Sequence, residues 1–352
     1  MTFDFIGDTH FTSTHHFNRA SFEDFLNWWE NNWNPTHERV LIHCGDLYDK
    51  NIVDGLTLTY GSRFINAALE KYQDVYILGG NHDLKNAIDF QTYASAYLAN
   101  TPHVHVITEP TIMKIADKTL MFLPHIHVPG DIGDYYNSML GNEFYKTPVD
   151  YAVAHVAFND KFLGGIDPNR FPNVKHWVCG HIHSSSTNPK VYPGSIMPFK
   201  IDEGSSYGNN IFTYNDDDKT TNIMPEFRKY VTVDYSKGQT EHLKKRDEKP
   251  VTIYKIINAP MNLNARDWPD SFVLTVEKQI QSQQISLLSG NSDSVLLDPW
   301  QMFQDMCEKE NLNVSRKAWK ILQKRLQPHS EPTVQPSPDS SAQVDNSQLT
   351  SA

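Results

Sequence analysis

Residues 74–83 read DVYILGGNHD: an apolar run, two glycines, and then an amide, an imidazole and a carboxylate. The apolar run predicts a buried strand, and glycine directly after it permits a sharp turn. Asn81, His82 and Asp83 are residue types that ligate metals or move protons. A polar surface turn would also account for this one segment, so the rest of the chain has to decide between the two interpretations.

The same arrangement, an apolar strand followed by a small residue and polar side chains, occurs in four more segments. Each segment alone is weak, because an isolated Asp-x-His or His-x-His is common on protein surfaces. Together they indicate one site, because ligands bind at the strand ends of open α/β sheets. The segments contribute Asp8 and His10 in FIGDTH, Asp46 and Asp49 in LIHCGDLYD, His155 in YAVAH, and His181 and His183 in WVCGHIH.

The predicted donors are too many for one tetrahedral ion. Carboxylate, imidazole and amide groups suit divalent metals such as Mn²⁺, Fe²⁺ or Zn²⁺. We therefore expect two divalent ions that share a bridging carboxylate. Two such ions, about 3.5–4 Å apart, clamp a phosphoryl group and generate the attacking hydroxide. The predicted ligands are Asp8, His10, Asp46, Asn81, His155, His181 and His183.

Composition excludes several classes of protein. Of the 352 residues, 39% are hydrophobic, which is typical of a packed globular chain. No apolar run approaches the roughly 20 residues of a membrane helix, and no signal peptide is evident, so we expect a cytoplasmic protein without a membrane partner. Three cysteines predict no disulfide framework. The net charge of −11 opposes nonspecific nucleic-acid binding by the whole surface.

The order of the predicted elements indicates an α/β protein. Strands alternate with helices at first, and a later strand-rich run predicts a second sheet. One helix is expected in SFEDFLNWWENNW, with Ser21 as its N-cap. The predicted organisation is a catalytic domain over 1–227, a small α/β accessory domain over 228–290, a helix-loop-helix over 291–327 and a disordered tail over 328–352.

The motifs D-x-H, GD-x-x-D, GNHD, a lone His and GH-x-H, in this order over residues 7–183, resemble the calcineurin-like metallophosphoesterase superfamily. The resemblance implies two facing mixed β-sheets flanked by helices. It also implies that His82 faces the scissile phosphate, that Asp83 hydrogen-bonds the His82 ring, and that Asp49 orients a ligand. The implied metal ligands are Asp8, His10 and His183 for the first ion, Asn81, His155 and His181 for the second, and Asp46 as the bridge.

GDLYD and the long extension after GH-x-H resemble the SbcD-like nuclease subunit, in particular its bacteriophage recombination-nuclease relatives. This resemblance implies a Mn²⁺-dependent DNA exo/endonuclease that works in recombination or repair in the bacterial cytoplasm, encoded by a phage or a cell. It also implies a DNA-facing capping domain, a C-terminal helix pair bound to an SbcC-like coiled-coil ATPase, and a homodimer. Two alternatives stay open: a stand-alone phosphodiesterase or phosphatase acting on nucleotides or small phosphoesters, and a non-catalytic scaffold that recruits an ATPase.

Some further polar and aromatic residues have simpler interpretations. His125 and His127 in LPHIHVPGD either approach the site or, as we expect, form a surface loop pair, and His15 and His16 are expected at the surface. The tryptophans of NWWENNW are expected to pack against the sheet or against a second copy of the chain.

Overall fold

A computed structural model of the chain describes residues 1–85, 92–126, 134–136, 138, 141, 147–158, 166–187, 191–203, 209–216 and 218–278. These residues belong to one compact unit, Met1–Ile280. The predicted helix pair at 291–327 and the tail at 328–352 lie outside the described residues. Among the residues that are described, no helix is long and apolar enough to cross a membrane.

The first sheet has six strands in the order β12-β11-β1-β2-β3-β6. Four of them, β1, β2, β3 and β6, run parallel, and β11 and β12 add an antiparallel hairpin beside β1. Their bounds are β1 (Thr2–Ile6), β2 (Arg39–His43), β3 (Asp74–Leu78), β6 (Val104–Ile107), β11 (Asn210–Asn215) and β12 (Asp218–Ile223).

The second sheet has four strands in the order β10-β9-β8-β7. It is also mixed, because β7 pairs antiparallel to β8 while the other pairs are parallel. The strands are β7 (Thr111–Ile115), β8 (Lys118–Leu123), β9 (Val149–His155) and β10 (Val174–Gly180). A short pair, β4 (Leu84–Lys85) and β5 (Thr92–Tyr93), precedes the 3-10 helix Ala94–Asn100.

The two mixed sheets face each other, as the resemblance implied. Their inner faces share one apolar core, and each contributing side chain alternates with an outward-facing neighbour. The core includes Phe3, Phe5, Val40 and Ile42 from the first sheet and Leu120, Phe122, Tyr151, Val153 and Val178 from the second.

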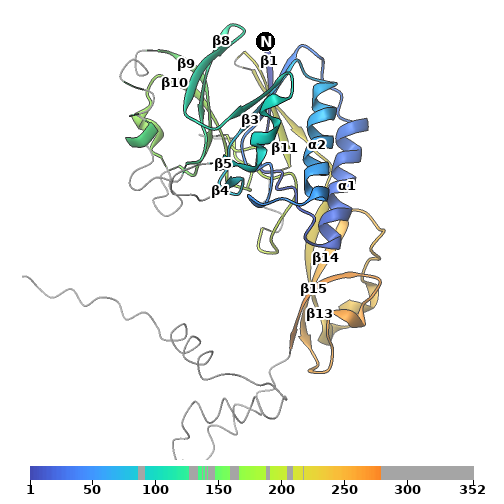
Figure 1. The fold of residues 1–352 in the computed structure, drawn as a ribbon. Helices are drawn as coiled ribbons and strands as arrows, with labels where there is room; N and C mark the ends of the chain where they lie inside the picture. Colours follow the sequence, from blue (N-terminus) through green and yellow to red (C-terminus); the bar gives the residue numbers. More distant parts are fainter. Residues whose placement is uncertain are drawn as a thin grey trace, which may run out of the picture. The chain divides into compact units, whose positions relative to one another are not determined.

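Two helices, α1 (His16–Asn31) and α2 (Gly55–Leu69), lie side by side over the outer face of the first sheet (Figure 1). Trp29 is fully buried there, and Trp28 and Trp33 pack partly buried against the same core. The predicted N-cap at Ser21 is wrong, because the helix begins one turn earlier and Ser21 Oγ donates to the carbonyl oxygen of Phe17. Phe17 packs against Phe272, and such tertiary contacts extend a helix beyond its local signals.

A third sheet follows the catalytic core, drawn in orange in Figure 1. It consists of three parallel strands, β13 (Arg228–Asp234), β14 (Val251–Ala259) and β15 (Phe272–Lys278), with β14 in the centre. All three strands lie within residues 228–290, for which the sequence predicts a small α/β accessory domain. The described connections contain the 3-10 helices Tyr235–Lys237, Gln239–His242 and Ala265–Asp267.

The third sheet contacts α1 through polar and apolar groups. Lys249 forms an ion pair with Asp24, and the guanidinium Nε of Arg228 donates to Ser21 Oγ over 3.1 Å. Arg228 is fully buried at this junction, so the first residue of β13 belongs to the interior of the protein.

Candidate metal centre

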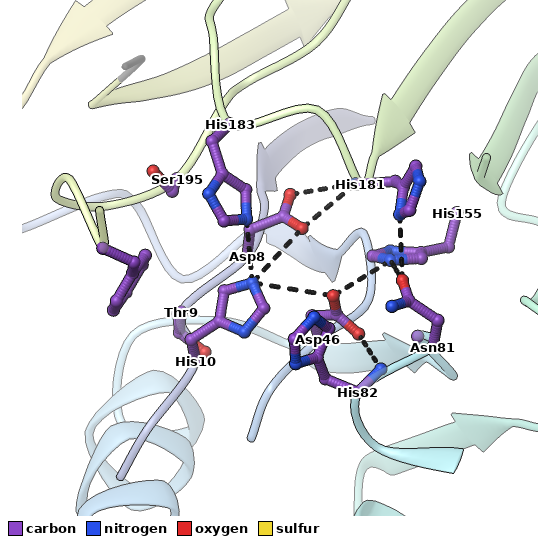
Figure 2. A network of polar contacts seen from close by, with 12 residues as sticks. Asp8, Thr9, His10, Asp46, Asn81, His82, His155, His181, His183 and Ser195 are labelled. Carbon is purple, nitrogen blue, oxygen red and sulfur yellow. Dashed lines mark hydrogen bonds and ion pairs between the residues drawn. The ribbon is translucent and has the colours of Figure 1, made fainter. Parts of the chain in front are cut away.

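The five sequence segments converge at one end of the two sheets. Asp8 and His10 follow β1, Asp46 follows β2, Asn81 follows β3, His155 ends β9, and His181 and His183 follow β10. Figure 2 shows the seven side chains around a common centre, with Asp46 between two groups. Parallel strands bring their carboxyl ends to the same edge of a sheet, which is why residues so distant in sequence meet.

The first group consists of Asp8, His10 and His183. His10 Nε2 lies 3.0 Å from His183 Nε2 and 3.9 Å from Asp8 Oδ1. The donor atoms of these three residues all lie within 4.8 Å of one another. Asp8 and His10 are buried, and His183 is partly buried.

The second group consists of Asn81, His155 and His181. Asn81 Oδ1 lies 2.9 Å from His155 Nε2 and 2.9 Å from His181 Nδ1. Asp46 lies between the two groups, since its Oδ2 is 3.2 Å from His155 Nε2 and 3.6 Å from His10 Nε2. Donor atoms of Asp8, Asp46 and His155, and those of His10, Asp46 and His82, also lie within 4.8 Å of one another, so the division of the ligands between two ions stays a prediction.

Two of the ring nitrogens that point away from the centre face acceptors. His155 Nδ1 lies 2.8 Å from the carbonyl oxygen of Cys44 and His183 Nδ1 lies 2.9 Å from Glu203 Oε1. His10 Nδ1, by contrast, is buried without a hydrogen-bond partner among the described residues, and Asp49 Oδ1 is 3.8 Å away. Metal-ligating histidines are held in this way by their second nitrogen, which fixes the ring and its tautomer. The donor set and these outer partners fit two divalent ions.

Electrostatics also prepare the donors for metal binding. Burial lowers the pKa of His10 well below its usual value and lowers that of His181 to about 3, so both rings stay neutral at pH 7. Burial would also lower the pKa of His155, but the charge and hydrogen bond of Asp46, together with the charge of Asp8 and the Cys44 carbonyl, raise the pKa to about 9. Metal binding must therefore displace a proton from His155.

Backbone conformation at the centre is unusual. Asp8, His10, Asp46 and His181 have φ values of 46°, 46°, 53° and 82°, in the left-handed region that non-glycine residues seldom adopt. Such strain gathers at functional sites, where the surrounding structure enforces it. One tie is visible in Figure 2, where the backbone N–H of His181 donates to Asp8 Oδ1 over 3.0 Å.

Gly80 is required by close approach. A Cβ atom at Gly80 would lie 2.1 Å from Asp46 Oδ1 and 2.2 Å from Asp46 N. Residue 80 therefore has to be glycine for the β3 loop to pack against the predicted bridging carboxylate. The sequence predicted a turn at the glycine pair, and the structure adds this steric reason.

His82 is about half exposed beside the first group, with its ring centroid 4.7 Å from that of His10. The expected hydrogen bond from Asp83 to the His82 ring is wrong. Asp83 is fully buried, and its carboxylate accepts from the backbone N–H groups of Tyr48 at 2.7 Å and Leu47 at 3.1 Å. His82 Nδ1 instead lies 2.9 Å from the backbone oxygen of Asp49.

Three residues at the centre differ from the expectations drawn from the sequence: His125 was expected elsewhere, and Phe199 and Glu203 were not predicted. His125, expected on a surface loop, is half-buried with its ring centroid 6.5 Å from that of His181 and 6.4 Å from that of His155. Phe199 packs its ring 4.9 Å from that of His10, and Glu203 contacts His183. The GH-x-H motif gave no signal for residues so far beyond it. His127 lies outside the described residues, and His15 and His16 are exposed as expected.

Comparison with known proteins identifies the family of the chain. The sequence profile of the calcineurin-like phosphoesterase family matches residues 1–185. No curated protein matches the chain. Among solved structures, phosphopantetheinyl hydrolase from Mycobacterium tuberculosis is 14% identical, with 55% of this chain and 88% of that chain covered and a TM-score of 0.35. A protein of unknown function from Aquifex aeolicus is 16% identical, with 49% and 86% covered and a TM-score of 0.29.

The chain therefore belongs to the calcineurin-like phosphoesterase family, whose profile covers every motif residue up to His183. Members of this family use divalent metals to hydrolyse phosphoesters, and the Asp and His groups described above are able to bind a metal.

Proposed function

We propose that the chain is a Mn²⁺-dependent DNA nuclease that hydrolyses phosphodiester bonds at this centre. The observation that carries the hydrolytic part is the convergence of two ligand groups on Asp46. When bound, two divalent ions polarise the phosphoryl group and acidify the attacking water. The ligands are Asp8, His10 and His183 for the first ion, Asn81, His155 and His181 for the second, and Asp46 for both.

His82 is proposed to act on the phosphate rather than on a metal. Its ring is exposed, and Asp49 contacts its Nδ1, so Nε2 is the nitrogen left for substrate. An imidazole in this position can stabilise the developing charge or donate a proton to the leaving oxygen. Asp83 acts indirectly. Its carboxylate accepts from the backbone N–H groups of Leu47 and Tyr48 and so holds the loop that carries Asp46.

A basic groove supports DNA as the substrate. It encloses about 400 Å³ between the start of α1 and the third sheet. The groove lining includes His15, His16, Arg246 and Arg266, two aromatic rings, and no carboxylate. The positive charge of Arg246 and Arg266 in this groove contrasts with the net charge of −11 of the whole chain. Arginines and aromatic rings are the groups that bind phosphates and stack on bases.

We further propose that residues 291–327 bind an SbcC-like coiled-coil ATPase and that the chain forms a homodimer. Residues 291–327 are predicted to form two short amphipathic helices, which would bury little apolar surface by themselves; this favours binding to a partner chain. The partly buried Trp28 on α1 and Trp33 just after it offer apolar surface for a second copy.

The test incubates the purified chain with Mn²⁺ and either linear duplex DNA or a chromogenic phosphodiester, with and without chelator. Shortened DNA supports the nuclease proposal. Turnover of the small ester with intact DNA favours the stand-alone phosphodiesterase, and no turnover with any divalent metal leaves only the scaffold.

Two substitutions sharpen this test. Arg266→Glu in the groove should reduce cleavage of DNA while turnover of the small ester stays unchanged. Lys114→Glu is the matched control, because Lys114 is exposed on β7, outside the groove lining, and should have no effect on either substrate. Equal DNA cleavage by both variants would remove the groove from the proposal and leave the metal centre in place.

A further inference from the structure

A segment after the GH-x-H motif forms one wall of the first ligand group. Glu203 accepts the backbone N–H of Phe199 through Oε2 over 2.6 Å, and its Oε1 lies 2.9 Å from His183 Nδ1. The Phe199 ring packs against both histidines of the group, with centroids 4.9 Å from His10 and 5.7 Å from His183. Glu203 therefore binds the backbone of its own segment with one carboxylate oxygen and contacts the predicted metal ligand His183 with the other.

The same segment is held from behind by β13 of the third sheet. Tyr230 Oη donates to the carbonyl oxygen of Phe199 over 3.0 Å, and Arg228 Nη1 donates to that of Pro198 over 3.4 Å. The Arg228 guanidinium also lies 5.5 Å from the centroid of the Phe199 ring. A charged group is seldom buried unless it secures several contacts at once, and two of the Arg228 contacts, to the Pro198 carbonyl oxygen and the Phe199 ring, fix residues 198–199.

We propose that Glu203 is a positioning residue for His183, and that Arg228 and Tyr230 make β13 a structural support of the first metal site. The inference rests on the proposed ligand role of His183. A carboxylate on the outer nitrogen fixes the ring and raises the basicity of the nitrogen that faces the ion. The third sheet then contributes to the metal site as well as to the proposed DNA groove, because its first strand, β13, determines where Phe199 and Glu203 lie.

The test measures Mn²⁺ binding by calorimetry on the full chain, where two binding events are expected. Glu203→Gln keeps the shape of the side chain but removes its charge, and should weaken one event by about 10–100-fold while leaving the other unchanged. Tyr230→Phe removes one hydrogen bond and should weaken the same event by about 2–10-fold. Glu226→Gln is the control, because Glu226 is an exposed glutamate outside this segment.

The outcomes separate the possible failures. If both binding events weaken equally and the melting temperature of the metal-free chain falls, Glu203 is merely structural and the inference is overturned. Unchanged binding in Glu203→Gln and Tyr230→Phe overturns it as well. His183→Asn tests the underlying proposal: if this variant still binds both ions, the ligand assignment itself is wrong. If His183→Asn loses one ion and Glu203→Gln weakens the same ion, the inference holds.

Discussion

Gly80→Ala places one methyl group at the most crowded point of the centre. The added carbon would start 2.1 Å from Asp46 Oδ1 and 2.2 Å from Asp46 N. Non-bonded heavy atoms are in favourable van der Waals contact at about 3.5 Å or more. The β3 loop and the Asp46 loop must therefore separate by roughly 1 Å. One neighbour is a backbone atom, and rotation of a side chain cannot relieve that clash.

A shift of this size has two measurable consequences. Misplacement of a catalytic group by about 1 Å lowers turnover by roughly 10²-fold. Overpacking a well-packed interior costs about 1–3 kcal/mol of unfolding free energy. We expect Gly80→Ala to show both effects, in hydrolysis of a chromogenic phosphodiester with Mn²⁺ and in urea denaturation of the metal-free chain.

Gly55→Ala is the matched control, since a Cβ at Gly55, the first residue of α2, would have no heavy atom within 4 Å. It should leave turnover unchanged and stabilise the fold slightly, because alanine reduces the conformational freedom of the unfolded chain. Wild-type turnover and stability in Gly80→Ala would show that the loops are not packed as described, and the steric argument for GGNHD would be lost.

Three other predictions concern His155, Asp54 and Asp83. Mn²⁺ affinity should rise with pH up to about 9, because below that value His155 carries a proton that the metal has to displace; calorimetry at pH 6.5, 7.5 and 8.5 measures this, and a flat profile contradicts the pairing of His155 with Asp46. Asp54→Ala should lower the unfolding free energy by about 1 kcal/mol, because Asp54 caps α2 by accepting from Thr57 N over 2.8 Å; an unchanged urea midpoint would argue against the cap. Asp83→Asn should cost about 1–3 kcal/mol, since the amide can accept only on one side where the carboxylate receives two backbone N–H groups, and full stability would mean that those bonds are dispensable.

The strands and the metal-centre residues were predictable because both depend on local patterns. Apolar runs such as those of β1, β2 and β3 mark strands, and polar residues directly after them mark strand ends. The order of the motifs then allowed the family to be recognised before the fold was known.

The wrong predictions concern residues whose positions are determined by contacts with residues distant in the sequence. Asp83 was assigned to its sequence neighbour His82, but its carboxylate satisfies backbone groups 35 and 36 residues away. Ser21 has the chemistry of an N-cap, yet tertiary packing extends α1 past it. Glu203 was missed because its importance comes only from what it touches, and the role of β13 was missed because it depends on contacts with residues 198 and 199.

The hydrogen bond between Asp8 and His181 joins residues 173 positions apart. A ribosome adding about 5–20 residues per second needs roughly 9–35 s to synthesise the stretch between them. During that interval the nascent chain has only part of its ligand set, so it cannot assemble the complete dinuclear centre. Binding of cations by the full ligand set therefore requires that β10 has joined the sandwich, and in a time-resolved refolding experiment it should follow the packing of α1 and α2 rather than precede it.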